Sequence, residues 1–345
     1  MKKCTVGGQA VMEGVMMKAP TGMAMAVRRT DGSIAVEYHK NTKIRKKGSF
    51  ATLPFVRGIV AFVESLVTGM KLTTRSAELL GEEFEEEPNK FEKWLAKVLG
   101  KSAMDIAMVI AVVLAVALSL GLFVFLPQLI VGFFGITSEF FRRLLEGAFR
   151  LLIFFGYIFA ISKIKDIKRV FQYHGAEHKT IACYEAELEL TPENAKKCSR
   201  FHPRCGTNYM FLVMAISIIV MAILSPILNN WIDMSNRIIR LLTSIVAIPL
   251  IAGISYEVLK GAAAHDNIFC RIVRAPGLAL QRLTTKEPDE SMLEVAITSF
   301  NLAMNPPDHD IVAEPPKKPE PVETKAEEES TEPTQQDKDG ATQES

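Results

Sequence analysis

The chain has 345 residues, a net charge of +1, 48% hydrophobic residues and 23% charged residues. These values exclude a collagen-like, coiled-coil or wholly disordered chain, and without a basic excess we expect no nucleic-acid partner. A mean hydropathy of +0.17 beside that much charge indicates apolar blocks next to charged ones.

Residues 1–50 are expected to form a small β-rich unit. The dipeptide Asp31-Gly32 stands between two alternating runs, MAMAVRR and IAVEYHK, and this arrangement is typical of a hairpin. The segment GGQAVMEGVMM near the start contains Gln9 and Glu13. It is interpreted either as a bend in this unit or as a strand and turn that docks near the 164–208 loop, which contains the candidate metal ligands.

Residues 51–80 place their apolar side chains on one helical face. This predicts an amphipathic helix, on the membrane surface or packed on other helices. A membrane span here stays an alternative, opposed by Glu64 near its middle. Residues 81–103 form an acidic and basic linker.

Four apolar blocks predict a mainly α, polytopic membrane protein with about four transmembrane helices. Helices 1 and 2 lie within 104–163, and helices 3 and 4 within 209–257. Pro127 predicts a bend in the first block, which leaves open whether 128–146 enters the membrane.

The distribution of positive charge predicts the orientation. Sixteen lysines and arginines lie in the segment 90–101 just before the first span, in the loop between spans two and three or in residues 258–274 just after span four, against three in the other two loops. By the positive-inside rule, both termini and the 164–208 loop are cytosolic.

The chemistry concentrates in the 164–208 loop. His174, Glu177 and His178 form an H-x-x-E-H pattern, which on a helix brings both imidazoles to one face. Zn²⁺ suits two imidazoles plus a carboxylate with an open position for water, and Glu177 is the candidate catalytic base. Glu257 at the end of span four is the candidate third ligand, with Glu13 as another. A solvated helix without metal remains the alternative.

A second cluster, Cys198, His202 and Cys205, follows in the same loop. Two thiols and an imidazole could form a structural zinc site, completed by His174, His178 or Cys183. The alternative is a short helix with a buried cysteine and a turn. Arg204 beside the membrane is interpreted as a motif position or an ordinary anchor.

Residues 258–304 are expected to contain one more amphipathic helix, over 285–304. Residues 305–345, rich in Pro, Glu, Thr and Gln, predict a disordered acidic tail that is dispensable for folding.

The segments GGQAVMEGVMM, YHGAEHKTI, HPRCGTN, AGISYEVLK and LQRLTTKEP resemble the bacterial YqhQ family over roughly residues 4–300. That family is described as uncharacterised, multi-pass and predicted metal-dependent, which implies a bacterial cell membrane location. The resemblance implies these motif positions: Gln9, Glu13, His174, Glu177, His178, His202, Arg204, Cys205 and Glu257.

Two functions fit these residues. The first is a membrane-embedded metal-dependent hydrolase or peptidase, with zinc on His174, His178 and Glu257, acting on a membrane-protein substrate at the cytosolic face. The second is a non-catalytic assembly, quality-control or scaffold protein with a structural zinc clip. Membrane lipid surrounds the protein in both cases, and the oligomeric state stays open.

Overall fold

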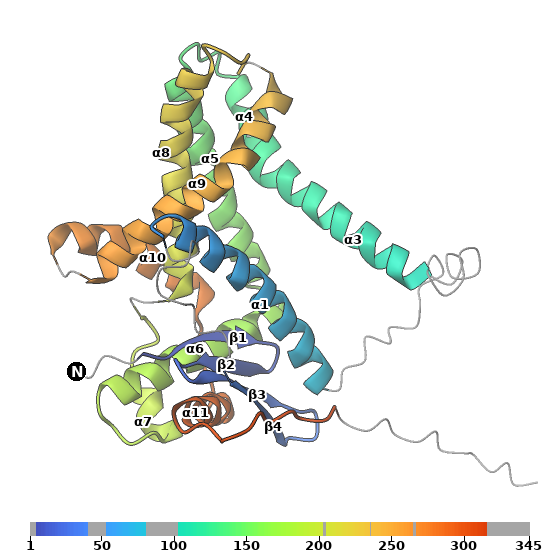
Figure 1. Ribbon diagram of the computed structural model, residues 1–345, viewed down its shortest axis with the longest axis vertical. Coiled ribbons are helices and arrows are strands. Elements are labelled where there is room, and N and C mark those ends of the chain that lie inside the picture. The colour runs from blue at the N-terminus through green and yellow to red at the C-terminus, as the bar shows by residue number, and fades with distance from the viewer. Residues whose placement is uncertain are drawn as a thin grey trace, which may run out of the picture. The chain divides into compact units, whose positions relative to one another are not determined.

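The computed structural model describes residues 5–40, 53–80, 103–202, 205–234, 236–264 and 267–315. They belong to one compact unit. Its elements in chain order (Figure 1) are β1 (Gly7–Val11), β2 (Gly14–Lys18), β3 (Gly22–Arg28), β4 (Ile34–Lys40), α1 (Val56–Leu80), α3 (Ala103–Leu120), the π-helix η3 (Gly121–Phe125), α4 (Leu126–Gly132), α5 (Glu139–Ile161), α6 (Lys165–Glu185), α7 (Pro192–Lys197), α8 (Gly206–Leu228), α9 (Arg237–Ala264), α10 (Ile268–Thr284) and α11 (Glu290–Met304).

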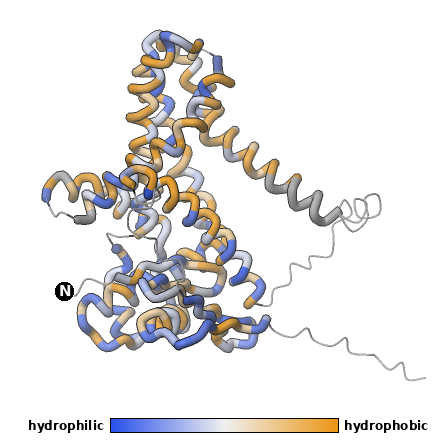
Figure 2. The backbone as a smooth tube through the Cα atoms, in the orientation of Figure 1, coloured by the Kyte–Doolittle hydropathy of each residue, from blue (hydrophilic) through white to orange (hydrophobic). Residues whose placement is uncertain are grey.

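Four stretches are long and apolar enough to cross a membrane, which confirms the predicted multi-pass class. They are Val113–Gly132, Glu139–Ile161, Gly206–Leu228 and Ile238–Ala262. Figure 2 shows hydrophobic residues dominating these helices, whereas the sheet, α6 and α7 carry mixed colours. The protein is therefore a membrane protein with an extramembrane unit built around the sheet.

The first span is continuous but changes its helical type before the predicted bend. Residues 121–125 form a π-turn, and Pro127 near the start of α4 has no N–H to donate to the Phe123 carbonyl four residues earlier. Arg150 Nε of α5 donates to the carbonyl of Phe123 at 2.8 Å. Gly135, with φ of 60°, makes the turn that leads into α5.

The sheet is a fully antiparallel meander in the order β1-β2-β3-β4. The predicted hairpin is confirmed: β3 pairs with β4, Gly32 has φ of 84°, and Asp31 accepts the Ser33 N–H at 2.8 Å. The β1–β2 turn places Glu13 at φ of 48°, a conformation that non-glycine residues adopt rarely.

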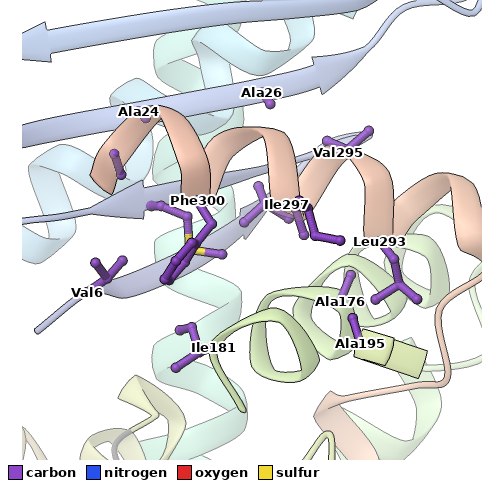
Figure 3. Close-up of a cluster of buried hydrophobic side chains, with 14 of the residues drawn as sticks. Val6, Ala24, Ala26, Ala176, Ile181, Ala195, Leu293, Val295, Ile297 and Phe300 are labelled. Carbon is purple, nitrogen blue, oxygen red and sulfur yellow. The ribbon is translucent and has the colours of Figure 1, made fainter. Parts of the chain in front are cut away.

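Helices α11 and α6 cover the sheet and close the main hydrophobic core (Figure 3). Phe300, Leu293 and Ile297 of α11 lie between Ala24 on the sheet and Ala176 on α6. Helix α11 occupies residues 290–304 of the range 285–304 predicted for an amphipathic helix, and its apolar face is buried in this core.

Helix α1 packs against α9 at its beginning and against the sheet near its end. A Cβ on Gly58 would lie 2.7 Å from Tyr256 Cβ, so the two helices meet at very short distance. Met12 N–H donates to Ser76 Oγ at 3.3 Å. Along the middle of α1, large apolar side chains such as Val63 and Met70 are exposed. Helix α1 thus packs on α9 and on the sheet, and contact with a membrane surface remains a prediction.

The start of the predicted tail is ordered. Ile311 and Tyr38 of β4 exchange two backbone hydrogen bonds of 2.9 Å, so disorder cannot begin at residue 305. The backbone hydrogen bonds to β4 stabilise this segment, although its amino-acid composition predicted disorder. Residues 316–345, and the predicted linker up to residue 102, lie outside the described residues.

Candidate metal centre

The H-x-x-E-H pattern lies in the middle of α6, as the spacing predicts. Asp166 stands in the first turn of this helix, where negative charge is favourable. His174 and His178, one turn apart, face the same side, and their ring centroids are 4.5 Å apart in an edge-to-face arrangement. His178 is buried and His174 is partly buried.

Both imidazoles are oriented by backbone carbonyls from other segments. His174 Nδ1 lies 2.9 Å from the carbonyl oxygen of Thr284, at the end of α10, and His178 Nδ1 lies 2.5 Å from that of Arg200. A carbonyl only accepts, so each Nδ1 donates its proton, and in this neutral tautomer the Nε2 lone pair of each ring points away from that carbonyl. This is the arrangement usual for histidines that bind a metal.

Both Nε2 atoms converge on the sulfur of Cys205. His174 Nε2, His178 Nε2 and Cys205 Sγ all lie within 4.8 Å of one another. His174 Nε2 is 3.2 Å from the sulfur, whereas His178 Nε2 is buried with no hydrogen-bond partner among the described residues. A buried lone pair aimed at a thiol and a second imidazole is what a divalent ion would satisfy.

Cys205 owes its position to the start of α8. It is the N-cap of this helix, and its sulfur accepts the Thr207 N–H at 3.4 Å. The partial positive charge at a helix N-terminus favours a negatively charged group there. The third ligand atom is therefore held at the junction between the extramembrane unit and a membrane helix.

Gln281, fully buried on α10, fixes the chain between α7 and α8. Its Oε1 accepts the His202 N–H at 2.9 Å, and its Nε2 donates to the His202 carbonyl at 2.8 Å and to Asn208 Oδ1 at 3.1 Å. Lys179 Nζ donates to the carbonyls of Lys196 and Cys198. These bonds hold the Arg200 carbonyl in place against His178.

Glu177 is buried and faces β1. It accepts the Gly8 N–H, and a Cβ on Gly8 would lie only 2.7 Å from Glu177 Cγ. Burial raises the pKa of this carboxyl above its ordinary value, while His174 and the Gly8 N–H act in the opposite direction. The segment that contains Gly8 thus docks on α6, as one of its two interpretations predicts.

The structure does not bring the two other candidate carboxylates to this group. Glu257 forms an ion pair with Arg57 of α1, with its Oε1 2.7 Å from Arg57 Nε. Glu13 pairs with Arg169 of α6 and accepts the Tyr173 hydroxyl at 3.2 Å. Both carboxylates therefore form ion pairs with arginines.

Of the second predicted cluster, only Cys205 joins the two α6 histidines. Cys198 hydrogen-bonds with Cys183, and both belong to the main core or its edge. The His202 ring lies 5.8 Å from that of His178, and its Nε2 is 3.4 Å from a Glu185 carboxylate oxygen.

The remaining predicted motif positions are not part of the group. Gln9 lies on β1, with its side chain near Gly69 of α1. Arg204 lies outside the described residues.

Sequence reasoning missed the residues that support the ligands. Thr284 and Arg200 act through main-chain carbonyls, which no pattern of side chains reveals, and Gln281 lies 79 residues from the His202 backbone that it holds. The available signal was the segment LQRLTTKEP, which contains both Gln281 and Thr284.

Comparison with known proteins gives a relationship but no activity. Residues 53–306 match the family described as "Protein of unknown function (DUF1385)". The chain is 37% identical over 301 residues to the "Uncharacterized protein YqhQ" of Bacillus subtilis (strain 168), covering 86% of this chain and 91% of that protein. No solved structure matches the chain.

Proposed function

Because the chain belongs to the DUF1385 family of unknown function, we propose its role from its own residues: a membrane protein whose extramembrane unit is fastened to its membrane helices by a zinc ion. His174 Nε2, His178 Nε2 and Cys205 Sγ would hold the ion. The observation that carries the proposal is that both Nδ1–H groups are bonded to carbonyls, which leaves both Nε2 lone pairs facing one sulfur.

The donor set favours zinc among the common divalent ions. Two imidazoles and a thiolate suit a borderline-soft ion, whereas magnesium and calcium prefer oxygen ligands. Within the described part of the chain the group supplies three ligands, so water or a further group would complete a tetrahedral site.

A structural role is supported by where the ligands and their supports come from. His174 and His178 belong to α6, Cys205 caps α8, and the orienting carbonyls belong to residues 200 and 284. An ion at this point would bind four segments together, and the free energy of metal binding would add directly to the stability of their packing. At a free zinc concentration 100 times the Kd this contributes about 2.7 kcal/mol.

A metal-dependent hydrolase is the second candidate. The observation that favours it is a buried carboxyl, Glu177, that interacts with the ligand His174. A zinc ion lowers the pKa of bound water towards ~7, and a carboxylate beside it could take the proton. In either role we place the site on the cytosolic side of a bacterial cell membrane, as the distribution of lysines and arginines indicates.

The test is the zinc content of detergent-purified protein, combined with its melting temperature. We expect equimolar zinc in the wild type and strong loss in His178→Ala and Cys205→Ser. Cys198→Ser and Glu257→Gln are matched controls that should keep zinc. Wild-type protein without zinc, or equal zinc in Cys205→Ser and Cys198→Ser, would refute the site.

The two roles separate in a second measurement. If zinc fastens the unit, a chelator lowers the melting temperature of the wild type but not that of Cys205→Ser. If chelation leaves the melting temperature unchanged, the structural role is wrong. A peptidase with Glu177 as base would instead lose peptide hydrolysis in Glu177→Gln while keeping its zinc.

A further inference from the structure

Among the polar side chains buried in the membrane-spanning helices, five lie near the loops that join α4 to α5 and α8 to α9, at the opposite end of α8 from Cys205. Each is at most 5% exposed, although these helices are mainly apolar. They are Gln128 on α4, Arg143 and Glu146 on α5, Ser225 on α8 and Arg240 on α9. Figure 1 shows these four helices packed beside one another. Buried ionisable groups within a membrane bundle are costly and usually serve a function.

The charges in this set do not balance. Glu146 receives Arg143 Nη1 at 3.3 Å on one oxygen and Arg240 Nη1 at 2.9 Å on the other. Two guanidinium groups therefore share one carboxylate, which leaves one positive charge without a counter-charge among the described residues. Interiors of membrane bundles normally pair such a charge.

Several donors in this set also lack partners. Among the described residues, the donors Arg143 Nε and Nη2, Arg240 Nε and Gln128 Nε2 are buried without a hydrogen bond, as is one acceptor, Gln128 Oε1. Buried donors are normally satisfied, so these atoms indicate an acceptor that binds from outside the chain. The acceptor must be negatively charged to balance the arginines.

An apolar cavity of about 320 Å³ lies one helical turn from this cluster along α5 and α9, because its wall residues Arg150 and Ser244 stand four positions after Glu146 and Arg240. Its walls come from α1, α3, η3, α5, α8 and α9, and include Leu241 and Ser244, the first of which follows Arg240 directly. Its one charged wall residue, Arg150, interacts electrostatically with both Glu146 and Arg143. The volume is at the small end of ligand sites, roughly 300–1,000 Å³.

We propose that the bundle binds an amphiphile with a single hydrocarbon chain and an anionic oxygen headgroup, a phosphate or a carboxylate. The headgroup pairs with the arginine cluster, and the chain fills the apolar cavity. Guanidinium groups bind such oxyanions through paired N–H donors. A free inorganic anion would satisfy the arginines but leave the cavity unfilled, so the cavity is what favours an amphiphile.

The proposal is tested by thermal unfolding in a non-ionic detergent with three probes: dodecyl phosphate, dodecanol and inorganic phosphate. Dodecyl phosphate at a hundredfold excess over its Kd should raise the melting temperature by roughly 4–5 °C. Dodecanol and inorganic phosphate should each give a much smaller rise. If inorganic phosphate raised the melting temperature equally, the site would bind free anions and the proposal of an amphiphile would be wrong. If dodecanol raised it equally, the proposed pairing of the headgroup with the arginines would be wrong.

Single substitutions test whether the rise in melting temperature depends on the arginine cluster and on the cavity. Arg143→Gln and Arg240→Gln should each abolish the rise, whereas Arg142→Gln, a neighbouring arginine paired with Glu139, should keep it. Ser244→Leu leaves the arginines in place and narrows the cavity, so it should remove the response to dodecyl phosphate even if the arginine variants fail to fold. An undiminished response in Ser244→Leu would refute the cavity as the chain site.

Discussion

Gly175, between the two metal-centre histidines, offers the sharpest test of the packing around α6. A Cβ at this position would lie 2.0 Å from the carbonyl oxygen of Lys286, a contact that cannot exist. Lys286 cannot move away freely, because its N–H donates to the Phe171 carbonyl at 2.8 Å. The glycine thus allows the chain after α10 to lie directly on the helix.

The expected effect of Gly175→Ala is a loss of about 2 kcal/mol. Alanine improves helix propensity by ~1 kcal/mol. Against this, forcing the backbone apart costs about 1–3 kcal/mol, and loss of the Lys286–Phe171 hydrogen bond adds ~0.5–1.5 kcal/mol. The shift would also move the Thr284 carbonyl, two residues earlier, away from His174 and lower the affinity for metal.

The assay is the melting temperature in detergent, with Gly156→Ala on α5 as the matched control. A Cβ on Gly156 meets no atom within 4 Å, so this variant should be as stable as the wild type or slightly more stable. Gly175→Ala should melt several degrees lower. If both variants were equally stable, the close approach of Lys286 to α6 would be refuted.

Three further predictions follow from other elements. Truncation after Asn305 removes the backbone pairing with β4 and should cost ~1–2 kcal/mol, whereas truncation after Pro315 should leave the melting temperature unchanged. Burial raises the pKa of Cys183 to about 11, so its neutral thiol should resist iodoacetamide at pH 8 in the native protein and react only after denaturation, as followed by mass spectrometry. In a background without native cysteines, Glu193→Cys should react with an impermeant maleimide only after the cells are permeabilised, and Trp231→Cys should react in intact cells; the reverse pattern would invert the topology.

The membrane helices and the hairpin could be predicted because their signals are local. Runs of apolar residues as long as a bilayer is thick and an Asp31-Gly32 turn between alternating strands need no knowledge of the rest of the chain. The ordered segment before Pro315 could not be predicted in this way. Its main bonds to β4 are backbone bonds, and its polar composition is that of a disordered tail.

In the candidate site, too, the local part could be predicted from the sequence and the part that depends on distant residues could not. The spacing of His174 and His178 placed both rings on one helix face, because a helix has a fixed period. The choice of Cys205 as the third candidate ligand required knowledge of which ring nitrogen faces it, and this depends on the carbonyls that bond the other ring nitrogen. One of these carbonyls belongs to Thr284, 110 residues from His174.

Glu257 illustrates why depth in the membrane is a weak guide to a ligand. It stands near the end of a span, as the prediction required, but Arg57 on α1 occupies its carboxylate. Among the described residues Cys205 forms no ion pair, and its sulfur lies at the N-terminus of α8, 3.2 Å from His174 Nε2 and within 4.8 Å of His178 Nε2. The same backbone turn that starts a membrane helix therefore also positions the candidate ligand, so an ion bound there would connect the position of α8 to that of α6.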